Sequence, residues 1–175
     1  GEACFSCRLC KEGHYNLCPD VKFLSTPFNK GAFAEYLVMR SDLVFKIPDT
    51  MSYEVASLAE PLSVGIHACE LVEARPGKSL LILGAGPIGL MALAAARSFG
   101  ATDITVCDIQ DNRLQLAKGY GAAHIWNSTK EQPGDMLEKY GEVEGFDCCI
   151  ETAGTGITQD LSISLTKKGG MIAFV

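Results

Sequence analysis

The most informative part of the sequence for the fold runs from Ser79 to Gly89 and reads SLLILGAGPIG. Its first five residues form a short apolar run, which is typical of a strand buried on both faces of a parallel sheet. Its glycines then predict a tight turn that leads into an Ala/Leu/Met-rich helix over residues 88–99. The uncharged residues 79–96 are nearly long enough to span a membrane, but the turn would break a spanning helix, so we expect no membrane segment.

The alternation of strand and helix continues towards the end of the chain. Beyond the helix stop at Gly100-Ala101, apolar runs and turn residues predict strands over residues 104–107, 124–126, 146–151 and 171–175. Helices are predicted between them over residues 112–118, 135–140 and 158–166, and a helix-like stretch over residues 62–71 precedes the first strand. Strands separated by helices in this way predict an α/β fold with a doubly wound parallel sheet.

Residues 1–61 have a different character, because they are rich in loops and show only short extended segments, 34–38 and 43–47. The sequence therefore predicts a loop-rich domain over residues 1–61 and a sheet domain over residues 62–175. The chain begins without Met inside a cysteine cluster and stops within an apparent strand. We therefore expect it to be an internal piece of a longer protein.

Charge and composition narrow the function classes. The chain has 175 residues, 15 Lys and Arg against 21 Asp and Glu, a net charge of −6, and a hydrophobic fraction of 47% that excludes disorder. The acidic excess occurs in both halves and no basic run exceeds Lys167-Lys168, so we expect no nucleic-acid partner. The absence of a recognisable secretory signal favours a cytoplasmic protein whose eight cysteines are thiolates or buried thiols.

Four cysteines, Cys4, Cys7, Cys10 and Cys18, form the pattern C-x2-C-x2-C-x7-C. Two-residue gaps let thiolates converge on one ion, and a fourth ligand from a short loop closes a tetrahedral sphere of sulfur. The spacing therefore predicts a structural zinc site that holds together a part of the chain with few apolar residues. Surface cysteines or a disulfide pair are one alternative, and an iron–sulfur cluster, which also uses C-x2-C-x2-C runs, is the other.

The glycines at positions 84, 86 and 89 form G-x-G-x-x-G between a strand and a helix, and Asp108 ends the next strand 19 residues beyond Gly89. This is the full context of a dinucleotide site: Gly84 makes the tight turn, Gly86 lets the backbone approach the pyrophosphate, and Gly89 packs the helix against the strand. Asp108 can accept hydrogen bonds from the ribose hydroxyls of NAD and would repel the 2′-phosphate of NADP. A helix N-cap is the alternative role for Asp108, and Arg113 is expected on the adenine side.

Several other residues are open to two interpretations, one functional and one purely structural. Glu60-Pro61 lies among apolar residues, where a carboxylate is expected to be paired, protonated or bound to metal, although a helix cap or a salt bridge would explain it as well. His67 is expected to be a core histidine. The remaining cysteines, Cys69, Cys107, Cys148 and Cys149, lie on apolar elements and are expected to be small buried side chains.

Three segments together resemble the zinc-dependent medium-chain dehydrogenases, and most closely their polyol dehydrogenase branch. These segments are GHYNLCP over residues 13–19, LAEPLSVGIHA over residues 58–68 and ILGAGPIGL over residues 82–90. The resemblance implies an incomplete Rossmann sheet preceded by part of a zinc-stabilised catalytic domain. It also implies oxidation of a secondary alcohol of a polyol, such as sorbitol or xylitol, to a ketone, with hydride transfer to NAD.

The resemblance assigns roles to residues of this chain. It places a structural zinc on the four clustered cysteines, NAD on the Gly84–Gly89 turn with Pro87 and Ile88 and on Asp108 and Arg113, and the catalytic zinc beside Glu60. The other catalytic-zinc ligands would precede Gly1, and the whole protein would be a homo-oligomer, a dimer or a tetramer. Threonine, butanediol or sugar-phosphate alcohol dehydrogenases remain open, as does a non-catalytic, zinc-stabilised NAD-binding module.

Overall fold

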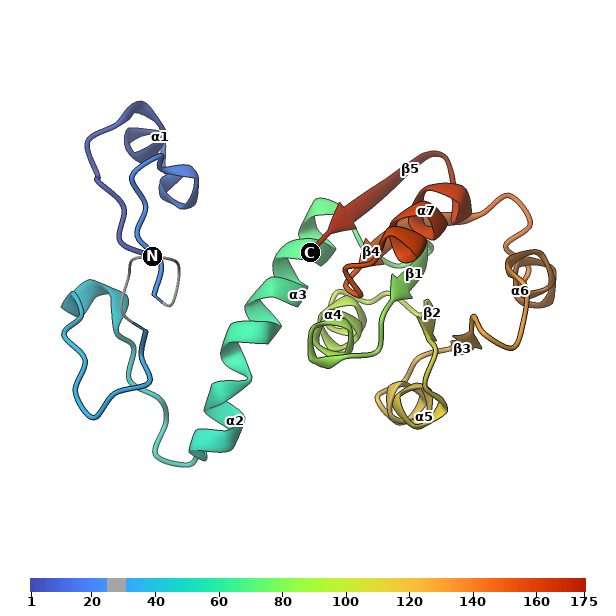
Figure 1. Cartoon of the computed structure of the whole chain (residues 1–175), viewed down its shortest axis with the longest axis horizontal. Coiled ribbons are helices and arrows are strands. Elements are labelled where there is room, and N and C mark those ends of the chain that lie inside the picture. The colour runs from blue at the N-terminus through green and yellow to red at the C-terminus, as the bar shows by residue number, and fades with distance from the viewer. Residues whose placement is uncertain (25–30) are drawn as a thin grey trace. The chain divides into compact units, whose positions relative to one another are not determined.

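The computed structural model describes residues 1–24 and 31–175 (Figure 1). The chain forms two compact units, Gly1–Pro48 and Asp49–Val175. The domain border predicted between residues 61 and 62 separates domains by function, whereas these two units are separated by their contacts. That border therefore stays a prediction.

The first unit is held together by short turns. It contains the helix α1 (Arg8–Lys11) and the 3-10 helices η1 (Tyr15–Leu17) and η2 (Ser41–Leu43). A single antiparallel bridge joins Glu2 and Lys22 through two backbone hydrogen bonds of 2.9 Å. The clustered cysteines lie at the first two of these elements: Cys7 is the N-cap of α1, Cys10 lies within α1, and Cys18 is the C-cap of η1.

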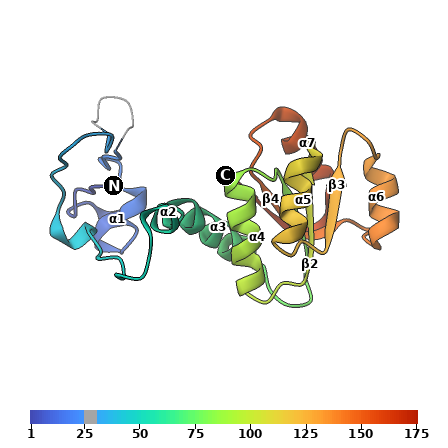
Figure 2. The same cartoon turned by 90° about the horizontal axis from the view of Figure 1, so that it is seen from below.

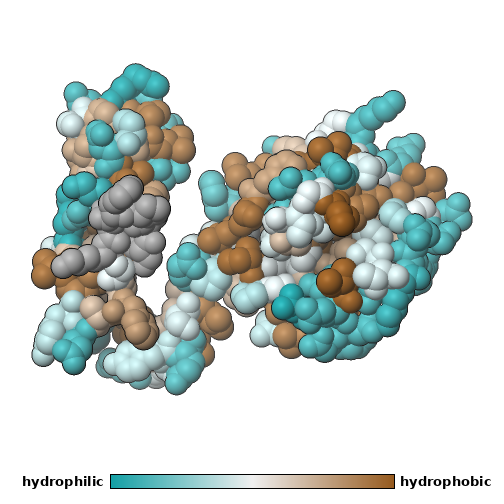
Figure 3. Space-filling view, in the orientation of Figure 1, coloured by the Kyte–Doolittle hydropathy of each residue, from teal (hydrophilic) through white to brown (hydrophobic). Residues whose placement is uncertain are grey.

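The extended segments expected over residues 34–38 and 43–47 are not strands in the structure. Tyr36, Val38 and Phe45 are at least 84% exposed. A strand needs a neighbour to satisfy its backbone groups, and among the described residues of this unit none pairs with these segments. Apolar side chains accordingly remain open on the surface of the unit (Figure 3).

The second unit is a five-stranded sheet flanked by helices (Figures 1 and 2). The helices α2 (Tyr53–Ser57) and α3 (Ala59–Leu71) precede it. The strands are β1 (Ser79–Leu83), β2 (Asp103–Asp108), β3 (His124–Asn127), β4 (Phe146–Glu151) and β5 (Thr166–Phe174), and the helices between them are α4 (Pro87–Ser98), α5 (Asp111–Gly119), α6 (Pro133–Tyr140) and α7 (Gly156–Leu165). All neighbouring strands are parallel, which confirms the predicted fold class.

The strand order β3-β2-β1-β4-β5 shows where a ligand can enter the sheet. The chain builds outward from β1 to β3 and then returns to place β4 on the other side of β1. The loops that leave β1 and β4 therefore run to opposite sides and open a crevice at the carboxyl ends of these two strands.

The sheet is covered on both faces by apolar side chains. On one face, the side chains of Leu80, Ile82 and Val106 belong to a core shared with helices α3, α4 and α5. On the other face, Leu81, Leu83 and Trp126 form a core with helices α6 and α7. Burial on both faces explains why these strands read as continuous apolar runs rather than as alternating ones.

Helix α3 packs closely on helix α4 at Gly65. A Cβ atom on Gly65 would lie 2.7 Å from the backbone nitrogen of Ala92, so only glycine allows this approach. The four cysteines outside the cluster are buried, as predicted. Burial raises the pKa of the Cys69, Cys107 and Cys149 thiols to about 12.

The last strand begins earlier than the sequence suggests. The helix predicted over residues 158–166 ends at Leu165, and β5 starts at Thr166 instead of residue 171. Residues 167–170, which include Gly169 and Gly170, bulge between the paired positions Phe146–Thr166 and Cys148–Met171. No helix among the described residues is both long and apolar enough to cross a membrane.

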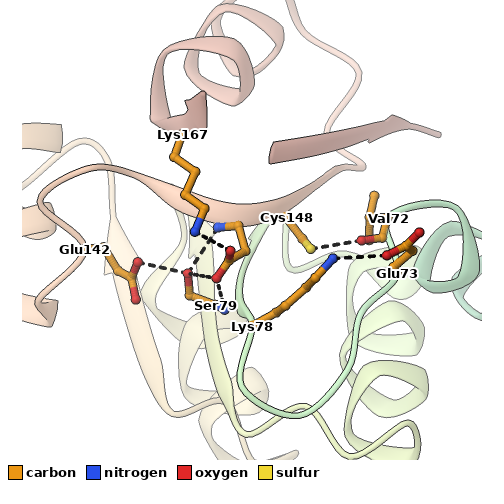
Figure 4. Close-up of polar contacts among 8 residues, drawn as sticks. Val72, Glu73, Lys78, Ser79, Glu142, Cys148 and Lys167 are labelled. Atoms are coloured by element: carbon orange, nitrogen blue, oxygen red, sulfur yellow. Dashed lines mark hydrogen bonds and ion pairs between the residues drawn. The ribbon is translucent and has the colours of Figure 1, made fainter. Parts of the chain in front are cut away.

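The amino end of the sheet carries a network of polar side chains (Figure 4). The hydroxyl of Ser79 donates to Glu142 at 2.9 Å, and its backbone N–H donates to Asp147 at 3.0 Å. The Lys167 ammonium group, which donates to Asp147, lowers the pKa of that carboxyl group. Partial burial instead raises the pKa of Glu142, with the neighbouring carboxylates of Asp103 and Asp147 adding to the effect.

The raised pKa of Glu142 predicts a pH dependence of stability. A group whose pKa is higher in the folded protein stabilises it fully below the pKa of the unfolded chain, and that contribution is lost as the pH rises through the folded value. Glu142→Gln removes the titration and keeps an oxygen that can accept from Ser79. We expect the free energy of unfolding of the variant, relative to that of the wild type, to increase as the pH rises above about 4.3.

Urea unfolding at a series of pH values measures this difference. Glu144→Gln, an exposed position two residues away, serves as the matched control and should follow the wild type. A Glu142→Gln variant whose stability tracks the wild type from pH 4 to pH 8 would contradict the assignment.

Candidate cofactor cleft and sulfur cluster

The four sulfur atoms predicted to bind metal come together in the first unit. The Sγ atoms of Cys4, Cys7, Cys10 and Cys18 all lie within 4.8 Å of one another, and those of Cys4 and Cys10 are 4.0 Å apart. Tetrahedral zinc with Zn–S bonds of about 2.3 Å requires sulfurs separated by about 3.8 Å. The cluster therefore fits a closed four-sulfur metal site without large rearrangement.

Backbone N–H groups point at the sulfurs. Those of Cys7 and Cys10 lie 3.3 Å from the Sγ of Cys4 and 3.5 Å from the Sγ of Cys7, respectively, and the N–H of Cys4 lies 3.4 Å from the Sγ of Cys18. Hydrogen-bond donors of this kind favour the thiolate, the form that binds metal. The two-residue gaps produce this geometry, because the turn after each cysteine brings an N–H back to the preceding sulfur.

Local hydrogen bonds and burial give the cysteines of the cluster different pKa values. The hydroxyl of Ser6 donates to the sulfur of Cys4 at 3.4 Å and lowers its pKa to about 6. Partial burial, reinforced by a hydrogen bond with Cys7, raises the pKa of Cys10 to about 12. Four sulfurs this close can all be thiolates only if a cation balances their charge, and a divalent metal ion provides one.

The glycine turn of the second unit is sterically fixed. Gly84 has φ +105°, and a Cβ atom on it would lie 2.7 Å from the Oγ1 of Thr152. A Cβ atom on Gly89 would lie only 1.9 Å from the carbonyl oxygen of Gly84. Gly86, the N-cap of helix α4, faces open space instead, and Pro87 and Ile88 begin that helix. The backbone at Gly86 is therefore open to a ligand at the helix N-terminus.

Asp108 faces this turn from the end of β2 and is 8% exposed. Its Oδ2 accepts the backbone N–H of Ala85 at 2.8 Å, and its Oδ1 accepts that of Gln110 at 2.9 Å. Helix α5 is capped at Gln110, so the alternative role of Asp108 as the N-cap is not what the structure shows. Each carboxylate oxygen keeps a second lone pair, so both can still accept a hydroxyl group.

Arg113 extends from helix α5 towards Asp108. Its Nη1 lies 3.9 Å from the Oδ2 of Asp108, and its side chain is 47% exposed. An ion pair this long and this exposed contributes little to stability. Its guanidinium group therefore remains available to a ligand beside Asp108.

A cleft of about 450 Å³ joins these residues at the carboxyl end of the sheet. Gly84, Gly86, Asp108 and Arg113 line one side of it. The loop after β4 and the start of α7 line the other side, with Thr152, Ala153, Thr155, Ile157, Thr158 and Leu161. The cleft thus lies at the point where the strand order reverses, and its volume is in the range of small-molecule sites.

No motif in the sequence marks this second wall. Thr152 follows directly after the last residue of β4, and Glu151, that last residue, is 1% exposed. The available signal was a pair of polar residues, Glu151 and Thr152, at the carboxyl end of a buried strand. This signal points to the cleft only when β4 is known to lie next to β1, the strand that leads into the glycine turn.

Two expectations about helix α3 are wrong. Glu60 lies exposed in the first turn of the helix, so its apolar neighbours in sequence do not enclose its carboxylate. His67 is no core histidine, because its side chain is 65% exposed and its Nδ1 lies 3.8 Å from the carboxylate of Glu70. Helix α3 buries only Gly65, Ala68 and Cys69, which a pattern of apolar letters alone does not distinguish.

The family described as zinc-binding dehydrogenase matches residues 87–175, and the alcohol dehydrogenase GroES-like domain matches residues 1–49. The chain belongs to the zinc-binding dehydrogenase family. The resemblance seen in the three sequence segments is therefore confirmed.

Relatives of this chain support the same placement. Sorbitol dehydrogenase of Bacillus subtilis is 46% identical over the whole chain, which covers 50% of that protein. The structure of an Escherichia coli oxidoreductase/dehydrogenase of unknown specificity is 42% identical with a TM-score of 0.93, over 98% of this chain and 50% of that one. A Sinorhizobium meliloti structure described as a zinc-binding dehydrogenase bound to NADP is 29% identical with a TM-score of 0.88, over 99% and 51%. The chain spans about half the length of these proteins.

The sulfur cluster predicts how the chain responds to metal loss. Elemental analysis should find zinc bound by the four cysteines, and Cys10→Ser should lower the zinc content by more than half because a closed site needs all four ligands. Chelation should speed hydrogen exchange in residues 1–24 and leave the amides of β1 and β2 protected.

Cys69→Ala is the matched control, since this cysteine is buried outside the cluster and its variant should keep the metal. Iron with visible absorbance in place of zinc would identify an iron–sulfur cluster, and metal content unchanged by Cys10→Ser would overturn the site.

Proposed function

We propose that this chain is part of a zinc-dependent polyol dehydrogenase that oxidises a secondary alcohol to a ketone and transfers hydride to NAD. The observation that carries the proposal is the cleft in which the glycine turn and the carboxylate of Asp108 face each other at the strand-order reversal. The sorbitol dehydrogenase relative supports the polyol as substrate.

The residues of the cleft fit a nicotinamide dinucleotide. The open backbone at Gly86 and the N-terminus of helix α4 suit the pyrophosphate, because unpaired N–H groups and the helix dipole favour an anion there. The remaining lone pairs of Asp108 suit the hydroxyls of a ribose, and Arg113 suits the adenine side. The nicotinamide of NAD supplies the hydride acceptor, and the turn positions it.

The carboxylate of Asp108 favours NAD over NADP, since a 2′-phosphate placed next to it would be repelled. The Sinorhizobium meliloti relative binds NADP. The guanidinium group of Arg113 can pair with a phosphate, but it lies 3.9 Å from the carboxylate of Asp108, which would repel the same phosphate, so NAD is the expected cofactor.

The two metals have different tasks in this proposal. Zinc on Cys4, Cys7, Cys10 and Cys18 is structural, because four sulfurs leave no position for substrate. A catalytic zinc in the whole protein supplies the Lewis acid that lowers the pKa of the alcohol. Glu60 is proposed to contact that metal or its water, and its exposed carboxylate on helix α3 is free to do so. Residues 1–61 are then part of the catalytic domain, and residues 62–175 the NAD-binding domain.

Asp108→Asn tests the cofactor assignment. The amide keeps one acceptor oxygen but loses the charge that strengthens its hydrogen bonds, so the dissociation constant for NAD should rise about tenfold or more and the preference over NADP should shrink. Isothermal calorimetry with both cofactors measures this. Asp103→Asn, at the opposite end of the same strand, should bind NAD like the wild type.

Glu60→Ala tests the catalytic assignment in the full-length protein. Turnover of sorbitol should fall by about a hundredfold or more, as expected for a group beside the catalytic metal, while the affinity for NAD stays unchanged. Glu70→Ala, another exposed glutamate of helix α3, is the matched control. Full turnover by the Glu60→Ala variant would remove Glu60 from the site. NAD binding without any turnover of alcohols by the wild type would instead favour a non-catalytic binding module.

A further inference from the structure

Glu151 is a buried carboxylate that the proposed reaction does not use. It ends β4 in register with Leu83 of β1, and it is 1% exposed. Its Oε1 accepts two backbone hydrogen bonds, from Ala153 at 2.8 Å and from Gly154 at 2.9 Å. A carboxylate is costly to bury, and the bonds that compensate for its burial here hold the backbone of the turn after β4.

Thr152, the next residue, connects the same turn to the glycine turn. Its backbone N–H donates to the carbonyl oxygen of Leu83 at 2.9 Å. Its hydroxyl lies 3.0 Å from the same oxygen and 3.3 Å from the carbonyl oxygen of Gly84, and donates to them. The hydroxyl fills the hollow left by two missing side chains, because a Cβ atom would lie 2.7 Å from it on Gly84 and 3.1 Å from it on Gly89.

These contacts join the two walls of the cleft. Gly84 lies in one wall, and Thr152 and Ala153 lie in the other. The chain segments are far apart in sequence and meet only because β4 lies beside β1. A displacement of the turn after β4 would therefore also move Thr152 relative to Gly84, which has φ +105°.

We propose that Glu151 and Thr152 are positioning residues of the cofactor site, which fix the turn after β4 against the glycine turn so that the cleft has its binding geometry before NAD arrives. The inference rests on the proposed NAD site. Pre-organisation of this kind raises affinity because the protein does not have to order its loops on binding.

Substitutions at Thr152 test the role of the hydroxyl. Thr152→Val keeps the shape and removes the donor, so the dissociation constant and KM for NAD should rise about three- to tenfold, with a smaller change in kcat at saturating NAD. Thr152→Ser restores the hydroxyl and should return both values to within about twofold of the wild type.

Thr105→Val is the matched control. Thr105 is completely buried in β2, and its hydroxyl has no hydrogen-bond partner among the described residues. The same chemical change there should leave NAD affinity at the wild-type value, with unfolding midpoints measured in parallel for all variants. A Thr152→Val variant that binds NAD as tightly as the wild type overturns the proposal, as does equal weakening by Thr105→Val.

Glu151→Gln gives a second readout that needs no cofactor. It weakens the acceptor while keeping the shape, so the amides of Ala153 and Gly154 should exchange hydrogen faster, whereas those of β2 keep their protection. Unchanged exchange at both amides would contradict the role of Glu151. If the wild type itself binds no NAD, the proposed function fails. If the wild type binds NAD and the Thr152 series is flat, only the positioning role fails.

Discussion

The close approach of Gly89 to the carbonyl oxygen of Gly84 is the constraint on which the second unit depends. A Cβ atom at Gly89 would lie 1.9 Å from that oxygen, a distance that no side chain tolerates. Because the approach is possible, helix α4 starts directly above β1 and lies flat against the sheet. The start of α4, the open backbone at Gly86 and the position of the cleft all follow from this contact.

The first unit has a different source of stability from the second. Its described residues bury few apolar side chains, with Cys18 the one buried hydrophobic position, and several large apolar groups lie on its surface. A segment of this kind cannot obtain its stability from a hydrophobic core, so a metal bound by four sulfurs is the natural substitute. The same chain thus combines a unit folded by packing with a unit organised around a sulfur cluster.

The cofactor cleft distributes its tasks between two walls. One wall carries the groups that recognise the dinucleotide, the glycine turn and Asp108. The other wall, which begins at Glu151 and Thr152, contacts the first through carbonyl oxygens at the end of β1. Asp108 is tied in as well, since it accepts the N–H of Ala85 within the glycine turn. Asp108 therefore both supports the glycine turn and belongs to the wall that recognises the dinucleotide.

The sequence predicted the sheet, the glycine turn with Asp108, and the four clustered cysteines, because each of these depends on local periodicity or on fixed spacing. It was wrong about the environments of Glu60 and His67, because the buried face of helix α3 is set by its packing on α4 at Gly65. It also missed Glu151 and Thr152, whose importance comes from β4 lying next to β1. Residues that are distant in the chain become neighbours through the strand order, which local sequence patterns do not specify.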